Sequence, residues 1–258
     1  TASPRDGSKF FYTGAIRGGS RMDWKHDKFL DRRAFLWVAA GATGAAALLG
    51  TPLAIRSSAE DVMSQPTPDQ AFAELMRGHQ RYREGRSGAH DLASHRSELA
   101  KGQQPIAAVL SCADSRVVPD LIFDQPSGRL FVVRVAGNFV TDDGQASLEY
   151  GVEFLNTPLI VVLGHSSCGA VDAAVKVAKD GLKLPGKLPA LADAIVPAVK
   201  AVEGHPGDLL ENAIAQNVRR NVEILRKAGP IIGPAAGSGK IRVIGGVYEV
   251  ATGAVAWL

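Results

Sequence analysis

The chain has 258 residues, 46% of them hydrophobic and 28 of them glycine, which suits one large or two small domains with a substantial core. Its net charge of +3 comes from one end: residues 1–59 hold nine Lys and Arg against four Asp and Glu, whereas residues 60–258 hold 20 against 22. Residues 60–258 therefore lack the basic excess of a nucleic-acid-binding domain, and two cysteines are too few for a disulfide framework.

The first segment of the chain is polar and shows no periodicity. It covers residues 1–21, and the first methionine of the chain, Met22, follows it. We expect residues 1–21 to be an upstream extension, either disordered or not native.

Residues 22–59 resemble a twin-arginine export signal. Arg32 and Arg33 precede an apolar run rich in Ala and Gly, and small residues follow at the spacing that a signal peptidase reads, ending at Ala59. This predicts a periplasmic or otherwise exported protein that is a substrate of the twin-arginine machinery. The apolar run spans about 17 residues and is short for a membrane span, so an uncleaved membrane anchor is the less favoured alternative.

Residues 60–258 show strand and helix patterns that alternate along the chain, which predicts an α/β fold. We expect a mostly parallel central sheet flanked by helices, a helical arm at its N-terminal end and an antiparallel edge at its C-terminal end. Residues 85–101 and 228–239 are polar or rich in Gly and Pro and are expected to be loops, the first with one helical turn at most. The expected helices are 69–83, 145–155, 169–178, 189–203 and 209–227, and the expected strands are 106–110, 130–135, 159–163, 241–248 and 255–258.

Both cysteines follow apolar runs that read as buried strands. Cys112 comes after residues 106–110, and His165 and Cys168 come after residues 159–163. Because the carboxyl ends of parallel strands meet at one edge of a sheet, these three side chains are expected to lie together. Cys, His and Cys form a three-ligand zinc set that leaves a fourth position open, which is the catalytic rather than the structural pattern.

Other roles for the two cysteines remain open at this point. They could be ordinary buried thiols, or a disulfide if the chain is exported. A thiol redox pair is less favoured because neither cysteine lies in a Cys-x-x-Cys motif. None of these alternatives gives a role to His165, Asp114 or Arg116. Asp114 and Arg116 follow Cys112 and could form a charge-assisted pair.

The motif Cys112-Ala-Asp114-Ser-Arg116, together with His165-x-x-Cys168-Gly169, resembles the β-class carbonic anhydrases, over about residues 67–258. Two residues depart from the usual family pattern, Val135 in place of Asn and His79 in place of a frequent Asn. The other matching segments are Gly78-x-x-Arg81-Tyr82, Lys101-Gly102-Gln103, Arg134-x-Ala136-Gly137-Asn138, Glu149-Tyr150-Gly151 and Gly246-x-Tyr248-x-x-x-Thr252-Gly253.

The resemblance implies reversible hydration of carbon dioxide to bicarbonate by one Zn²⁺ per subunit, held by Cys112, His165 and Cys168. It implies that Asp114 and Arg116 are catalytic: Asp114 accepts a hydrogen bond from the zinc-bound nucleophile while Arg116 holds it. In a closed form known in the family, Asp114 would instead bind the metal. Val109 stands where members that close carry tryptophan, so we expect the open form here.

The resemblance also implies a set of substrate-binding residues. Gln103 would donate a hydrogen bond to a substrate oxygen, the Gly169 N–H would lie beside the bound anion, and Phe131 and Tyr150 would line a small apolar pocket, with Tyr150 contributed by the partner subunit. Family members are homodimers or tetramers. Two alternatives share the same metal site: hydrolysis of carbon disulfide or carbonyl sulfide, and a structural zinc without catalysis.

Overall fold

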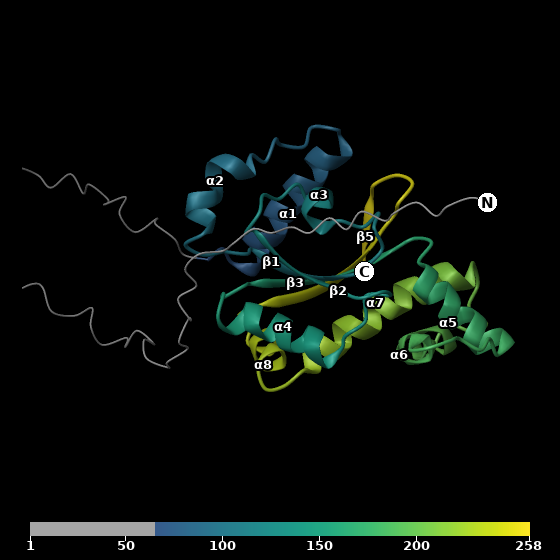
Figure 1. The fold of residues 1–258 in the computed structure, drawn as a ribbon. Coiled ribbons are helices and arrows are strands. Elements are labelled where there is room, and N and C mark those ends of the chain that lie inside the picture. Colours follow the sequence, from purple (N-terminus) through teal and green to yellow (C-terminus); the bar gives the residue numbers. More distant parts are fainter. Residues whose placement is uncertain (1–64) are drawn as a thin grey trace, which may run out of the picture. The chain divides into compact units, whose positions relative to one another are not determined.

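The computed structural model describes residues 65–258 (Figure 1). The expected extension at 1–21 and the export signal at 22–59 lie outside the described residues. No helix within residues 65–258 is long and apolar enough to cross a membrane.

The described residues form one five-stranded sheet with the order β2-β1-β3-β4-β5. Strands β2, β1, β3 and β4 are parallel, and β5 runs antiparallel to β4. The predicted mostly parallel sheet with an antiparallel edge is confirmed. The strands are β1 (Ala107–Ser111), β2 (Leu130–Arg134), β3 (Leu159–His165), β4 (Arg242–Tyr248) and β5 (Val255–Trp257).

Helices cover both faces of this sheet (Figure 1). The figure places α1, α2 and α3 on one side and α4, α5, α6, α7 and α8 on the other. The helices are α1 (Pro68–Arg83), α2 (Leu92–Leu99), α3 (Pro119–Ile122), α4 (Asp142–Glu153), α5 (Gly169–Asp180), α6 (Leu188–Lys200), α7 (Leu209–Lys227) and α8 (Ile232–Gly237).

Three of these helices differ from the sequence prediction. The expected loop at 85–101 contains the eight-residue α2, the expected loop at 228–239 contains α8, and α3 was not expected. Helix α2 has an N-cap, since the Asp91 carboxylate accepts a hydrogen bond from the Ala93 N–H at 2.9 Å. No residue of α2 is buried within the described chain, so its sequence lacks the apolar periodicity that identifies a helix.

Strand β1 is buried on both faces and its side chains alternate between two cores. Val109 packs into the core that α1 and α3 cover, which contains Leu75 and Ile122. Leu110 points to the opposite core, which contains Leu148 of α4 and Val218 of α7. This burial on both faces explains why the strand reads as a continuous apolar run.

A third core lies beyond the carboxyl ends of the strands, among α5, α6 and α7. It contains Cys112 and Cys168 packed with Val171, Ile195 and Ile214. The two cysteines therefore lie at the sheet edge where the sequence places them, with an apolar wall of helices beside them.

Candidate metal centre

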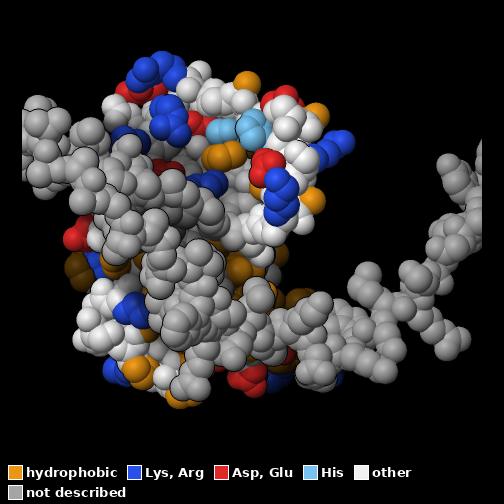
Figure 2. All heavy atoms as spheres, turned by 90° about the vertical axis from the view of Figure 1, so that its left-hand side faces the viewer, with side chains coloured by type: hydrophobic (Ala, Val, Ile, Leu, Met, Phe, Trp, Pro, Cys, Tyr) orange, Lys and Arg blue, Asp and Glu red, His pale blue; other side chains and the backbone are white. Residues whose placement is uncertain are grey.

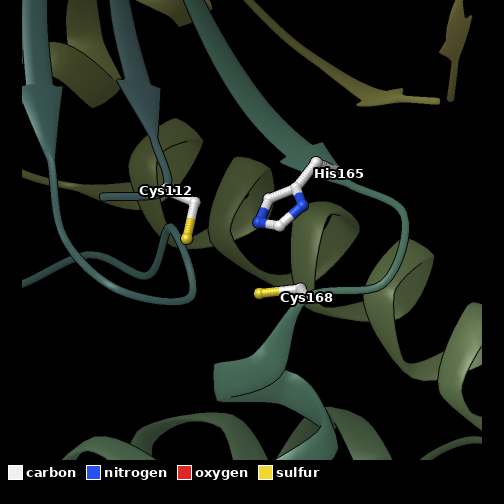
Figure 3. A group of neighbouring side chains, drawn as sticks. All are labelled: Cys112, His165 and Cys168. Atoms are coloured by element: carbon white, nitrogen blue, oxygen red, sulfur yellow. The ribbon is translucent and has the colours of Figure 1, made fainter. Parts of the chain in front are cut away.

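Cys112, His165 and Cys168 come together at the carboxyl edge of the sheet. Cys112 directly follows β1, His165 is the last residue of β3, and Cys168 is the N-cap of α5. Their potential ligand atoms lie within 4.8 Å of one another, and all three residues are buried. Figure 3 shows the three side chains pointing toward a common point between the two strand ends.

The histidine ring has the orientation that a metal ligand needs. His165 Nδ1 lies 2.9 Å from the carbonyl oxygen of Ser166 and so carries the proton that it donates there. The other nitrogen, Nε2, is then left with its lone pair. It is buried and has no hydrogen-bond partner among the described residues, which costs free energy unless a further group occupies the space beside it. The donor set, two sulfurs and one imidazole nitrogen, fits Zn²⁺.

The two thiols differ in acidity. The pKa of Cys112 lies well below its usual range, because the neighbouring Cys168 thiol stabilises its anion and outweighs the cost of burial. The His165 ring and the N–H groups of Gly137 and Asp114 add to this stabilisation. The pKa of Cys168 is raised by the neighbouring Cys112 and by burial. Cys112 is therefore the more acidic thiol of the pair, and metal binding through both sulfurs must release a proton.

Asp114 lies beside this group and is held by Arg116. Arg116 donates from Nε to Oδ1 at 2.9 Å, from Nη2 to Oδ2 at 2.8 Å and from its backbone N–H to Oδ1 at 3.0 Å. These hydrogen bonds hold the pKa of Asp114 well below its usual range. Asp114 Oδ2 is also 3.8 Å from His165 Nε2, so the ionised carboxylate lies next to the potential ligand atoms.

The side chain of Arg134 fixes the loop that carries Cys112 and Asp114. Arg134, the last residue of β2, donates to the carbonyl oxygens of Cys112 at 3.0 Å, Asp114 at 2.6 Å and Val117 at 2.8 Å. Its guanidinium is thus occupied by the loop.

A second connection fixes the loop between His165 and Cys168. The Ser166 hydroxyl donates to Glu249 at 2.8 Å and accepts from the Val250 N–H at 3.0 Å, which ties this loop to the end of β4.

Gly169 is the first residue of α5, directly after Cys168. Its N–H belongs to the first turn, where backbone donors have no acceptor within the helix. A Cβ added at Gly169 would meet no heavy atom within 4 Å among the described residues, so the backbone here faces open space. Gly169 is thus placed where an anion could reach its N–H.

Gln103 does not join this group within the chain. It precedes β1, whereas Cys112 follows it, and the ladder extends below the strand because the Gln104 N–H donates to Gly128 O at 3.2 Å. At about 3.3 Å per residue, the five residues of β1 alone span roughly 15 Å between Gln103 and Cys112. Gln103 lies at the opposite end of β1 from Cys112 and therefore from the Cys–His–Cys group.

The surroundings of Gln103 form a cavity of about 690 Å³, lined by α2 and by residues 101–104 and 126–129. Figure 2 turns this side of the molecule toward the viewer and shows histidine, basic and acidic side chains together on its upper part. None of Cys112, Asp114, His165 and Cys168 lines this cavity.

Phe131 and Tyr150 lie together, away from the ligand-bearing strand ends. Their ring centroids are 6.2 Å apart, and Tyr150 also stacks on Phe154 at 5.2 Å. Phe131 pairs in register with Ala108 at the start of β1, on the edge strand β2. Tyr150 is 48% exposed and Phe154 is 62% exposed, so the aromatic cluster faces outward.

Several residues that the sequence interpretation did not assign to the site hold its loops in place. Arg134 and Glu249 hold the ligand loops, and Asn217 and Asn221 of α7 hold the segment after β2. The signal available in the sequence was the two asparagines spaced by four on the apolar face of a helix, where a polar pair indicates a buried hydrogen-bond partner.

Comparison with known proteins agrees with this geometry. Residues 107–255 match the family described as "Carbonic anhydrase". Carbonic anhydrase 2 of Mycobacterium tuberculosis is 35% identical over 192 residues, covering 74% of this chain and 93% of the relative. The carbonic anhydrase of Mycolicibacterium smegmatis is 34% identical over 160 residues, covering 62% of this chain and 78% of the relative.

Solved structures show the same fold. The β-carbonic anhydrase CcaA superposes with a TM-score of 0.58 at 30% identity, covering 72% of this chain and 94% of that chain. The Coccomyxa β-carbonic anhydrase, solved in complex with acetazolamide, gives a TM-score of 0.56 at 26% identity, covering 72% of this chain and 86% of that chain. With a parallel sheet whose carboxyl edge carries the Cys–His–Cys group, the chain belongs to the β-class carbonic anhydrases, a family of enzymes.

Proposed function

We propose that this protein catalyses the reversible hydration of carbon dioxide to bicarbonate and a proton, using one zinc ion held by Cys112, His165 and Cys168. The observation that carries the proposal is the buried group of three ligand atoms with an ionised aspartate beside it. When bound, zinc supplies the Lewis acidity that lowers the pKa of a water molecule toward neutrality.

The residues of the chain then divide the remaining work. Asp114 is ionised and can only accept hydrogen bonds, so it takes one from the nucleophile and keeps the nucleophile's lone pair directed at the substrate carbon. Arg116 fixes the carboxylate in that position through two side-chain hydrogen bonds. The Gly169 N–H at the start of α5 is placed to donate to an oxygen of the anionic product.

Rate measurements on the purified full chain test the substrate. Carbon dioxide hydration should be fast, and hydrolysis of carbonyl sulfide or carbon disulfide should be negligible by comparison. A protein that carries zinc but turns over only the sulfur compounds would replace the proposed substrate, and one that turns over none would leave a structural zinc.

A second copy of the chain completes the site in this proposal. Gln103 lies at the opposite sheet edge from its own metal ligands, and Tyr150 and Phe154 leave an exposed aromatic cluster beside the edge strand β2. An edge strand flanked by exposed aromatic side chains, here on α4 and its C-cap, is typical of a surface that another chain covers. In a two-fold symmetric dimer, Gln103, Phe131 and Tyr150 of one subunit would serve the metal centre of its partner.

Co-expression of two inactive variants tests this arrangement. In a mixed dimer of Gln103→Ala with His165→Ala, the subunit that keeps its ligands receives an intact Gln103 from its partner. Random pairing makes half of the dimers mixed, each with one intact site, so about a quarter of the sites should be active. Cys112→Ser with His165→Ala is the matched control, because both residues bind the metal of their own chain and no site is restored. Equal activities for the two mixtures would refute the shared site.

A further inference from the structure

Helix α7 presents two asparagines on its buried face. Asn217 is 1% exposed and Asn221 is 2% exposed. Burying a side-chain amide costs free energy unless its polar atoms are hydrogen-bonded. The two side chains meet this requirement partly through each other, since Asn221 Nδ2 donates to the backbone oxygen of Asn217 at 2.8 Å and to its Oδ1 at 3.1 Å.

The remaining hydrogen bonds of this pair go to the segment that follows β2. Asn217 Nδ2 donates to the carbonyl oxygen of Gly137 at 2.8 Å, and Asn221 Oδ1 accepts from the Val140 N–H at 2.8 Å. The contact from Asn221 to Asn217 Oδ1 turns the Nδ2 of Asn217 toward Gly137. The pair thus holds the segment at both ends.

The held segment donates a hydrogen bond to a metal ligand. The Gly137 N–H lies 3.2 Å from Cys112 Sγ. Gly137 has a φ of +86°, and a Cβ added to it would lie 2.5 Å from Ile195 Cδ1. The backbone of Gly137 is therefore packed directly against α6 on one side, and the hydrogen bond to Asn217 holds its carbonyl oxygen.

The two sulfurs differ in their N–H donors. Cys168 is the N-cap of α5 and its side chain accepts no capping hydrogen bond, although the nearby N–H groups of Ala170 and Val171 act to lower the pKa of its thiol. Cys112 has the Asp114 N–H from its own loop at 3.4 Å and the Gly137 N–H from a separate segment at 3.2 Å. The hydrogen bond from the Gly137 N–H depends on the two asparagines of α7, whereas the one from the Asp114 N–H does not.

We propose that Asn217 and Asn221 are positioning residues of the metal centre, which hold the Gly137 N–H on Cys112 Sγ and so reduce the charge that this sulfur donates to the metal. A hydrogen bond to a thiolate withdraws electron density from sulfur, and such second-layer partners tune the bound metal. The proposal rests on the proposed metal site but not on the reaction with carbon dioxide.

Cobalt substitution of the full-length protein tests the proposal by spectroscopy. Cobalt bound to two thiolates gives a sulfur-to-metal charge-transfer band, whose energy falls when a sulfur becomes more electron-rich. Asn217→Leu removes the donor to Gly137 O and should shift this band to longer wavelength. Val222→Ala, on the same helix with its side chain against Gly245 of β4, is the matched control for general destabilisation and should leave the band in place.

The outcomes separate this proposal from the proposed metal site. Absence of a charge-transfer band in the wild type would refute the site itself. A normal wild-type band with no shift in a folded Asn217→Leu protein, or an equal shift in Val222→Ala, would refute the positioning role. If Asn217→Leu fails to fold, Asn221→Ala decides the question, because it keeps Asn217 but removes the bonds that orient it. A smaller shift in the same direction supports the proposal, and an unchanged band overturns it.

Discussion

Both carboxylate oxygens of Asp114 accept hydrogen bonds from the guanidinium of Arg116, Oδ1 from Nε at 2.9 Å and Oδ2 from Nη2 at 2.8 Å. The same Oδ2 lies 3.8 Å from His165 Nε2. Asp114 therefore stands between two positive partners, the guanidinium that holds it and any metal bound by His165. The conformation in this structure is the one with Arg116.

Arg116→Ala should remove most of the carbon dioxide hydration activity while leaving the metal bound. Without the guanidinium, the Asp114 carboxylate is free to turn toward the metal and occupy the position that the reaction requires. Hydration rates and metal content of the same preparation check this. Arg116→Lys keeps the charge but cannot form the two parallel hydrogen bonds. Its hydration activity should lie between that of Arg116→Ala and that of the wild type. Full activity in Arg116→Ala would remove Arg116 from the mechanism.

The pH dependence of activity should be gentle below neutrality. Hydrogen bonds from Arg116 hold the pKa of Asp114 below its usual value of about 4, so this carboxylate stays ionised throughout the neutral range. The Asp114–Arg116 pair then does not break on mild acidification, and the rate should follow a single ionisation. A steep cooperative loss of activity just below neutral pH, deepened by bicarbonate, would show instead that Asp114 leaves Arg116.

Three neighbours stabilise the buried carboxylate of Asp124, whose side chain is 1% exposed. Arg81 Nε donates to Oδ2 at 2.5 Å, and the Gly88 N–H and His90 Nε2 lie 2.9 Å from Oδ1. Burial raises the pKa of Asp124, but these contacts outweigh it and leave the pKa below the usual value. Asp124→Asn should reduce the free energy of unfolding by about 2 kcal/mol at pH 7, the contribution of hydrogen bonds to a charged group.

The sign of the pH effect follows from the lowered pKa of Asp124. Its stabilisation is complete above the unfolded value of about 4 and is lost as the pH falls through the folded value. Urea unfolding should therefore show that the free energies of unfolding of wild type and Asp124→Asn differ less at acid pH than at pH 7. Asp193→Asn, at an exposed position of α6, is the control and should leave the free energy of unfolding unchanged at both pH values. A gap that grows on acidification would contradict this account.

The strands and the Cys–His–Cys group could be predicted from the sequence, for one physical reason. Central strands that are buried on both faces require continuous apolar runs, and the residues after them are fixed at the sheet edge, as Cys112 and His165 show. Helix α2 could not be found in this way because none of its residues is buried within the described chain. Spacing along the sequence also did not show that Gln103 and Cys112 lie at opposite ends of the five-residue strand β1.

Export by the twin-arginine route is a prediction about residues outside the described structure. Arg32→Lys combined with Arg33→Lys should keep the protein in the cytoplasm, because the route depends on the arginine pair. Fractionation of cells that express wild type and double variant measures this, with Lys25→Arg as a control that changes a basic residue elsewhere in the same segment. Normal periplasmic accumulation of the double variant would exclude this route.

The central claim is that hydration activity depends on one zinc ion held by Cys112, His165 and Cys168. The most direct test measures the carbon dioxide hydration rate of the wild-type protein against its zinc content, as a chelator removes the metal and added zinc restores it. The account predicts a rate proportional to occupancy up to one zinc per chain, and His165→Ala should neither retain zinc nor recover activity. A rate that persists without zinc, or a His165→Ala protein with full zinc content and activity, would contradict it.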